Sequence, residues 1–171
     1  MCSSDLVNSR YVTAENGGGS ALIANRTAIG PWEQFDEFVT PATISLQASV
    51  NGRYVTAENG GASSLIANRD AVGLWERFDQ IDAGGGYLAL RAQVNGRYVT
   101  AENAGGSPLI ANRTAVGPWE KFRAVVHVDA SISLLALANG RWVSADNAGT
   151  SPLIAKAVSA GLWEQFRGSP L

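Results

Sequence analysis

The sequence predicts an all-β protein built of four tandem copies of one unit, and three observations support this. The unit opens with an asparagine at positions 8, 51, 95 and 139 and ends near a tryptophan at positions 32, 75, 119 and 163, so both ends step by 43, 44 and 44 residues. A fixed period of this size indicates a repeat architecture. Within each unit, short segments alternate apolar and polar residues, and Asn-Gly or Gly-rich turns separate them, as expected for strands.

Length and composition are consistent with one domain over residues 1–171, with copies at about 1–43, 44–86, 87–130 and 131–171. Charged residues make up 16% of the chain and the net charge is −2, which is too small to direct the protein to nucleic acid or to an anionic membrane. No apolar run reaches the roughly 20 residues needed to span a bilayer, and no signal peptide is visible. We therefore expect neither a nucleic acid nor a membrane as partner.

The first segment of each copy carries apolar residues at every second position, which predicts a half-buried strand. These positions are Ile44, Leu46, Ala48 and Val50 in copy two, Leu88, Leu90, Ala92 and Val94 in copy three, and Ile132, Leu134, Ala136 and Ala138 in copy four. Copy one has Met1, Ser3, Asp5 and Val7 instead. Because residues 2–6 match the translated end of a common sequencing adapter, we interpret residues 1–6 as an artefact, together with the single cysteine, Cys2.

Three further strands are expected in each copy. The Asn-Gly pairs at 51, 95 and 139 predict two-residue type I′ turns, after which the β-branched and aromatic segment 53–57 forms a return strand. A Gly-rich turn then leads to a third strand at 64–67. Trp75, Phe78 and Ile81 lie three apart, so a tight turn should precede the fourth strand.

The motif Gly-Arg-Tyr-Val-Thr-Ala, followed by Ala-Asn-Arg and Gly-Pro-Trp-Glu-Gln-Phe, resembles the lobes of fascin-like β-trefoil domains, particularly those appended to secreted bacterial carbohydrate-active enzymes. The resemblance covers residues 7–167. It implies a β-trefoil-type barrel capped by hairpins, in which each lobe supplies four strands. It also implies an extracellular location, as part of a larger secreted protein.

The family has three lobes, whereas this chain has four copies. Since copies one and four keep the same apolar motif as the middle copies and lack polar caps, we expect the array to close on itself. The first expectation is a closed barrel of four lobes, which would be a monomer. The alternative is a three-lobed β-trefoil with one extra lobe, attached or exchanged between chains.

No catalytic residues are assigned, and no cofactor or metal is expected. Two sets of carboxylates recur, Glu15, Glu58, Glu102 and Asp146 in the hairpin and Glu33, Glu76, Glu120 and Glu164 after the tryptophan. Four equal glycosidase sites would be needed if these pairs were catalytic, so ion pairing and capping of backbone N–H groups is the favoured interpretation. The single histidine, His127, has no second histidine or functional cysteine for a nucleophile or zinc site.

The candidate ligand site is the polar cluster formed by Glu-Asn in the hairpin and Asn-Arg after the third strand. Its members are Glu15, Asn16, Asn25 and Arg26 in copy one, Glu58, Asn59, Asn68 and Arg69 in copy two, and Glu102, Asn103, Asn112 and Arg113 in copy three. Amides, carboxylates and guanidinium groups beside an aromatic ring can bind a sugar. The same residues could instead form turns and ion pairs only, and the aromatic residues could belong to the core.

Copy four has Lys156-Ala157 in place of Asn-Arg, so we predict three competent copies and one weakened or silent copy. The expected partner is an oligo- or polysaccharide, bound multivalently. The alternatives are a fascin-like protein-binding or scaffolding module, and a repeat that only spaces an enzyme from its substrate.

Overall fold

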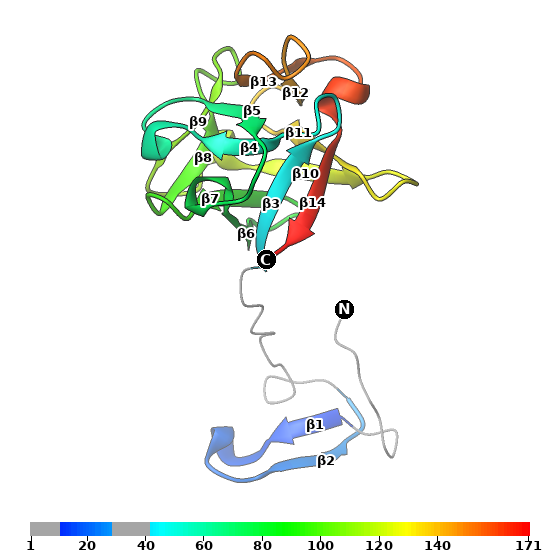
Figure 1. Ribbon diagram of the computed structural model, residues 1–171. Helices are drawn as coiled ribbons and strands as arrows, with labels where there is room; N and C mark the ends of the chain where they lie inside the picture. The colour runs from blue at the N-terminus through cyan, green and yellow to red at the C-terminus, as the bar shows by residue number, and fades with distance from the viewer. Residues whose placement is uncertain (1–10, 29–41) are drawn as a thin grey trace. The chain divides into compact units, whose positions relative to one another are not determined.

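The computed structural model describes residues 11–28 and 42–171, which belong to two separate units and are shown in Figure 1. Residues 42–171 contain copies two, three and four, and residues 11–28 contain the hairpin of copy one. The predicted adapter residues 1–6, the polar positions Ser3 and Asp5, Trp32 and Glu33 lie outside the described residues. The single domain expected over the whole chain stays a prediction.

Each of copies two to four forms the four strands that the sequence predicts. In copy two these are β3 (Ala42–Ala48), β4 (Tyr54–Ala57), β5 (Leu65–Arg69) and β6 (Phe78–Asp82). In copy three they are β7 (Leu88–Ala92), β8 (Arg97–Ala101), β9 (Leu109–Arg113) and β10 (Phe122–Val126), and in copy four β11 (Ile132–Ala136), β12 (Arg141–Ala145), β13 (Leu153–Ala157) and β14 (Phe166–Pro170). The tight turn expected before each fourth strand is a short 3₁₀ helix: η4 (Leu74–Glu76), η5 (Pro118–Glu120) or η6 (Leu162–Glu164).

The first and last strands of the three copies form a closed barrel of six antiparallel strands (Figure 1). The pairing runs from β3 to β6, β7, β10, β11 and β14, and β14 returns to β3 over five residue pairs from Phe166↔Ala48 to Pro170↔Ile44. The predicted closure is thus made by three copies, and the four-lobed barrel that we placed first does not form from the described residues. The reason is that β3 has hydrogen-bonded neighbours on both sides, so the barrel has no free edge for another lobe.

The middle strands of the copies form three hairpins, β4–β5, β8–β9 and β12–β13, each with a register shift after its first residue pair. The strands β5, β9 and β13 all contact one another, as expected for a threefold arrangement of the hairpins. Beneath them lies a core with threefold repetition, in which Phe78, Phe122 and Phe166 are fully buried. Burial of such apolar side chains is the main source of stability in a barrel of this size.

The Asn-Gly turns differ from the predicted type I′ hairpins. In copy two the loop spans residues 49–52, closed by a hydrogen bond from Gly52 N to Ala48 O at 2.9 Å, and only the glycine has positive φ (68°). Asn51 does not have a positive φ, and its side chain forms two hydrogen bonds: Nδ2 donates to Ala67 O at 2.9 Å and Oδ1 accepts from Arg53 N at 3.0 Å. Asn95 and Asn139 repeat both bonds. The asparagine therefore ties the loop to the third strand, which a two-residue turn would not do.

These asparagines also link neighbouring copies in a closed circle. Asn95 lies against Gly61, Asn139 against Gly105 and Asn51 against Gly149, so that a Cβ on any of these glycines would come within 2.1–2.2 Å of the amide nitrogen. The circle runs from copy two to three, three to four and four to two. Like the barrel, it is completed by three copies.

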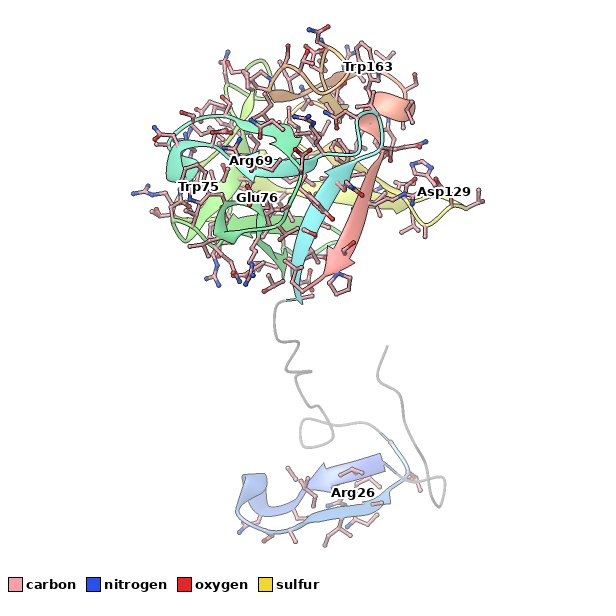
Figure 2. All side chains as sticks on the ribbon, in the orientation of Figure 1. Arg26, Arg69, Trp75, Glu76, Asp129 and Trp163 are labelled. Carbon is pink, nitrogen blue, oxygen red and sulfur yellow. The ribbon has the colours of Figure 1, made fainter. Side chains whose placement is uncertain are left out.

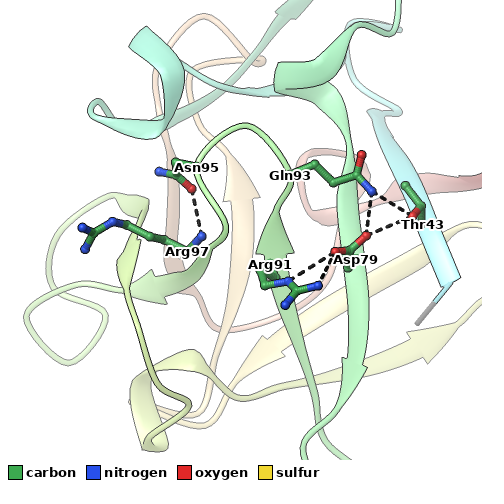
Figure 3. A network of polar contacts seen from close by, with 6 residues as sticks. All are labelled: Thr43, Asp79, Arg91, Gln93, Asn95 and Arg97. Atoms are coloured by element: carbon green, nitrogen blue, oxygen red, sulfur yellow. Dashed lines mark hydrogen bonds and ion pairs between the residues drawn. The ribbon is translucent and has the colours of Figure 1, made fainter. Parts of the chain in front are cut away.

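One polar cluster breaks the threefold symmetry, at the seam between copies two and three (Figure 3). The buried carboxylate of Asp79 accepts hydrogen bonds from Thr43 Oγ1 (2.9 Å), Gln93 Nε2 (2.8 Å) and Arg91 Nη2 (2.9 Å). Burial acts to raise the pKa of the Asp79 carboxyl, but the bonds from Gln93, Arg91 and Thr43 and the charge of Arg91 outweigh it, so the pKa lies below its ordinary value. The equivalent positions in copies three and four are Arg123 and Arg167.

The described part of copy one is a two-stranded hairpin, with β1 (Tyr11–Ala14) and β2 (Leu22–Arg26) joined through the 3₁₀ turn η1 (Glu15–Gly18). Its register matches the hairpins of the other copies, including the shift after the first pair. Among the described residues, no helix is long and apolar enough to cross a membrane.

Candidate functional site

The predicted Glu, Asn and Arg residues meet on one face of each hairpin. In copy two, Glu58 directly follows β4 and stands two residues after Thr56. Asn68 lies in β5, two residues after Ile66, which pairs with Thr56. Residues two apart in a strand point to the same side, so the side chains of Glu58 and Asn68 share a face. The register shift at the start of the hairpin brings Arg69 to the same carboxylate.

The contacts within the cluster are short and repeat from copy to copy. Asn68 Nδ2 donates to Glu58 Oε1 at 2.7 Å, and Arg69 Nη2 lies 2.8 Å from the same oxygen. The matching distances are 2.9 and 2.7 Å for Asn112 and Arg113 on Glu102 in copy three, and 2.7 and 3.0 Å for Asn25 and Arg26 on Glu15 in copy one. The structure thus brings together three of the four predicted residues in each of copies one to three.

The arginine of the cluster remains accessible. The side chains of Arg69 and Arg113 are each 41% exposed, and the carboxylates they bind are about a quarter exposed. In copy three the guanidinium also lies near a second carboxylate, with Arg113 Nε 3.9 Å from Glu120 Oε1. The cluster therefore presents the N–H donors of a planar guanidinium group beside a partly exposed carboxylate.

The fourth predicted residue of each copy, Asn16, Asn59 or Asn103, lies at the tip of the hairpin. Each has positive φ, between 53° and 56°, and each is exposed. Asparagine is the non-glycine residue that best tolerates this left-handed conformation, so its type is explained by the turn. Its role as a ligand-binding residue stays a prediction.

The carboxylates after the tryptophans have the structural role that the sequence analysis favoured. Glu76, Glu120 and Glu164 are buried, and each accepts a hydrogen bond on Oε2 from a glycine N–H three residues earlier, at 2.7–2.8 Å. The other oxygen of Glu76 and Glu120 accepts from a buried threonine hydroxyl, Thr56 or Thr100. Sequence reasoning missed these threonines, although the recurring Val-Thr-Ala, with a threonine between two core residues, was a visible signal.

Copy four builds a different pair at the same place. Lys156 stands where copies two and three have asparagine, and its Nζ lies 2.6 Å from Asp146 Oδ1. The hydrogen bond from Lys156 lowers the pKa of the Asp146 carboxyl; partial burial opposes this, and the backbone N–H of Asn147 adds to it. The arginine position is Ala157, which ends at Cβ.

The aromatic residues near the clusters belong neither wholly to the core nor wholly to the surface. Tyr54, Tyr98, Trp142, Trp75 and Trp119 are half-buried. Trp163 of copy four is 41% exposed and lies at the periphery of its unit, as Figure 2 shows. Their expected assignment to the core is therefore only partly correct, and Trp163 departs from it most.

His127 lies in the loop between β10 and β11, and its Nε2 is 2.8 Å from Ser133 Oγ. Among residues 11–28 and 42–171 there is no group of three or more His, Cys, Asp or Glu side chains arranged to hold a metal ion.

Comparison with solved structures shows a β-trefoil fold. The chain matches the designed threefold-symmetric protein ThreeFoil with a TM-score of 0.69 and 27% identity, over 75% of this chain and 99% of that one. It matches a lectin from Polyporus squamosus bound to Neu5Acα2-6Galβ1-4GlcNAc with a TM-score of 0.67 and 16% identity, over 79% of this chain and 51% of that one.

An exo-β-1,3-galactanase from Clostridium thermocellum is also similar, with a TM-score of 0.69 and 14% identity. That match covers 80% of this chain but only 32% of the galactanase, so the chain spans about a third of that protein. No family model and no curated protein sequence matches the chain. The neighbours thus include carbohydrate-binding β-trefoil lectins and glycosidases, at low sequence identity.

Proposed function

We propose that the chain is a non-catalytic, lectin-like module that binds carbohydrate at several copies of one site. The observation that carries this proposal is the repeated cluster: an accessible arginine, an asparagine and a glutamate held in the same contacts in each of copies one to three. The lectin and glycosidase neighbours support it at the level of the fold.

The chemistry of the cluster suits sugar hydroxyls. In copy two, Glu58 Oε1 orients both Asn68 and Arg69, so the guanidinium is held in place without being buried. A planar guanidinium has five N–H donors, and a fork of donors can serve two adjacent hydroxyl oxygens of a sugar ring. The partly exposed carboxylate supplies the acceptor for a hydroxyl proton.

No catalytic role is proposed for the recurring carboxylates. Glu58 and Glu102 are bound by Asn and Arg, and Glu76 and Glu120 are buried on Thr and Gly donors. A glycosidase needs one carboxyl that holds a proton and one that does not, at a set separation. Carboxylates that already accept hydrogen bonds from Asn, Arg, Thr or Gly are better suited to positioning neighbouring side chains than to proton transfer.

The test is glycan capture by variants of the arginine. Arg69→Ala should reduce capture on a glycan array, and the triple variant Arg26→Ala, Arg69→Ala, Arg113→Ala should abolish it, because avidity falls with each site lost. Arg141→Ala is the matched control, since Arg141 is exposed and lies outside the clusters. Capture that is not competed by free sugar, or that survives the triple variant in folded protein, would contradict the proposal.

The alternative is a fascin-like protein-binding or scaffolding module, and one feature favours it. The end of β10 exposes Val126 and the loop that follows exposes Val128, and the Gly-rich loop between β6 and β7 has no equivalent apolar pair. The small negative charge of the chain opposes binding to an acidic filament such as actin. Cosedimentation with actin filaments distinguishes the two functions. Scaffolding is favoured if the protein pellets with the filaments and excess free sugar does not change the amount that pellets.

A further inference from the structure

The strand β10 continues beyond the closed ring of the barrel as one side of a projecting hairpin. Its last residues, up to Val126, pair with β11, and the pairing extends to a hydrogen bond of 2.8 Å from His127 N to Ser131 O. Asp129 closes the turn by accepting from the backbone N–H and the hydroxyl of Ser131, at 3.1 and 2.7 Å. Figures 1 and 2 show the tip of this hairpin, where Asp129 lies, standing out from the barrel. The hairpin is therefore held in an extended form as far as its tip.

The other side of β10 has no partner strand beyond Phe122 among the residues that the structure describes. On that side β10 pairs with β7 at Phe122↔Leu88 alone. In copy two, the equivalent strand β6 pairs with β3 over three residues, as far as Gln80↔Ala42. Ala124 is the equivalent of Gln80, and no described strand pairs with it on this side.

The Gly-rich turn between β6 and β7 explains this difference. Residues 84–86 are glycines with positive φ, between 66° and 77°, a conformation in which an extended strand does not continue. Tyr87 N donates to Gly84 O at 3.2 Å, and the Tyr87 carbonyl accepts from Ala83 N at 3.0 Å. The chain therefore turns back toward β6 before it could pair with Ala124, and the edge of β10 stays open.

The backbone groups on this open edge are those of Ala124 and Val126. The N–H and C=O of one residue point to the same side of a strand, and that side alternates along the chain. Lys121 O and His127 N both bond across the hairpin to the β11 side, so the N–H and C=O of Ala124 and Val126 point to the open side. An edge with free donors and acceptors is a template for one more strand.

The equivalent edge in copy four is blunted. On that side β14 also has a single pair, Phe166↔Ile132. Pro170, however, stands where β10 has Val126, and a proline has no N–H to donate. Among the described strands of copies two to four, β10 therefore offers the edge that is both open and able to donate at each of its positions.

The side chains beside the open edge indicate what kind of strand it would accept. Arg123 is exposed, and its guanidinium lies 5.1 Å from the centroid of the Tyr87 ring, with Nη2 3.5 Å from the Tyr87 hydroxyl. None of the ion pairs between described residues includes Arg123. Val125 and Val126 are 37% and 70% exposed. A positioned cation without a carboxylate partner, beside apolar side chains, complements a carboxylate that is flanked by apolar residues.

We propose that the open edge of β10 binds an extended segment of another protein, in which a carboxylate stands between two apolar residues. The segment adds antiparallel to β10, in line with β7. Its apolar residues lie opposite Ala124 and Val126 and share a face with them. The acidic residue between them lies opposite Val125, on the same face as Arg123 and diagonal to it, where a glutamate can reach the guanidinium. This interaction does not depend on the proposed sugar binding.

The experiment is an NMR titration of the full chain with the peptide acetyl-Thr-Val-Glu-Val-Thr-amide, and with acetyl-Thr-Val-Lys-Val-Thr-amide as the comparator. The backbone amide signals of Ala124 and Val126 should shift, because these are the open donors. Since the open edge is short, Kd for the glutamate peptide should be on the order of 1 mM. The lysine peptide should bind at least about threefold more weakly, because its charge repels Arg123.

Three variants separate the backbone edge from the charge. Ala124→Pro removes one donor of the open edge and keeps the hairpin bonds to β11, so it should raise Kd at least about tenfold. Arg123→Ala leaves the edge intact and therefore tests the proposal even if Ala124→Pro does not fold. It should make the glutamate and lysine peptides bind equally, since the charge that distinguishes them is lost. Arg167→Ala, the equivalent change in copy four, is the matched control and should leave both Kd values unchanged.

Each outcome decides for or against the acidic segment. Shifts at Ala124 and Val126 that follow the glutamate peptide, and a preference that disappears in Arg123→Ala, support it whether or not the chain binds sugar. The proposal is overturned if folded protein shows no shifts at these amides, if the lysine peptide binds as tightly as the glutamate peptide, or if Arg167→Ala has the effect expected of Arg123→Ala. A dimer in light scattering that Ala124→Pro abolishes would also overturn it, because the occupant of the edge would then be a second copy of this chain.

Discussion

The hairpins of copies one and two have nearly the same sequence and the same register, yet their valine and leucine side chains differ strongly in burial. Val12 is 42% exposed while its equivalent Val55 is fully buried, and Leu22 is 61% exposed while Leu65 is 1% exposed. Both hairpins pair their strands with the same shift after the first residue pair. The comparison shows that the hairpin itself is a local structure, whereas its burial depends on neighbouring copies around a shared axis.

Three copies complete the structure, so each copy has two neighbours. Contacts among β5, β9 and β13, the circle of asparagines and glycines, and the pairing of β14 with β3 each close with copies two to four. A closed barrel has no free edge that would pair with another chain, which is consistent with the monomer that we expect. The oligomeric state itself stays a prediction.

The largest effect should come from truncating the same leucine in the two hairpins. Leu65→Ala should lower the free energy of unfolding by about 2–5 kcal/mol, since it opens a cavity beneath the β4–β5 hairpin. Leu22→Ala, its equivalent in copy one, should change it by less than about 0.5 kcal/mol, because that side chain is already exposed. Urea unfolding measures both.

Equal losses of unfolding free energy in Leu65→Ala and Leu22→Ala would contradict this expectation. They would mean that Leu22 is buried in solution, against another chain or in an exchanged lobe, and light scattering on the same samples would then have to show an oligomer.

The glycines that contact asparagines of the next copy should be the next most sensitive positions. Gly105→Ala combines a φ of 81° with a Cβ placed 2.2 Å from Asn139 Nδ2, so we expect a loss of about 3 kcal/mol. Gly96→Ala has a φ of 68° but no atom within 4 Å, and should cost about 1–2 kcal/mol. Thermal unfolding of the two variants is the measurement, and equal midpoints would argue against the interlock between copies.

A smaller, pH-dependent effect is expected at the seam between copies two and three. Because the folded-state pKa of Asp79 is lowered, its contribution to stability is present above the unfolded pKa of about 3.9 and is lost as the pH falls through the folded-state value. Asp79→Asn should therefore cost about 1–3 kcal/mol at pH 7 and progressively less below pH 4.

Urea midpoints of the wild type and of Asp79→Asn, measured from pH 7 to pH 2, test this. Thr43→Val is a useful companion, since it removes one donor and keeps the charge. Parallel curves for wild type and Asp79→Asn at all pH values would show that the carboxylate is not stabilised as an anion.

The smallest effect on stability should come from the arginine of the cluster. Arg69→Ala should shift the free energy of unfolding by no more than about 0.5 kcal/mol, since its ion pair with Glu58 is partly exposed and copy four already has Ala157 there. Thermal unfolding measured beside glycan capture separates the two roles. If Arg69→Ala unfolds the protein while capture per folded molecule is unchanged, the arginine is a structural ion-pair partner.

Much of the candidate site could be predicted from the sequence, because comparison of the four copies shows which residues recur and which change. Four copies in register showed which Glu, Asn and Arg recur, and alternation along a strand placed Glu58 and Asn68 on one face. The exposure of Trp163 could not be predicted, because it depends on which residues lie beside the indole. The Asp79 cluster was also missed, since it joins residues 36 and 14 positions apart that only strand pairing brings together.

The sequence by itself determined the repeat, the four strands in each of copies two to four and the residues of the cluster, because these depend on periodicity and on backbone preferences among neighbouring residues. Only the tertiary structure decided that copies two to four close the barrel while copy one forms a separate hairpin. Four near-identical copies carry the same apolar faces and the same linking residues, so no local signal distinguishes a closing lobe from an extra one. The number is decided by geometry: when β14 pairs with β3, both edges of the barrel are used, and six strands complete it.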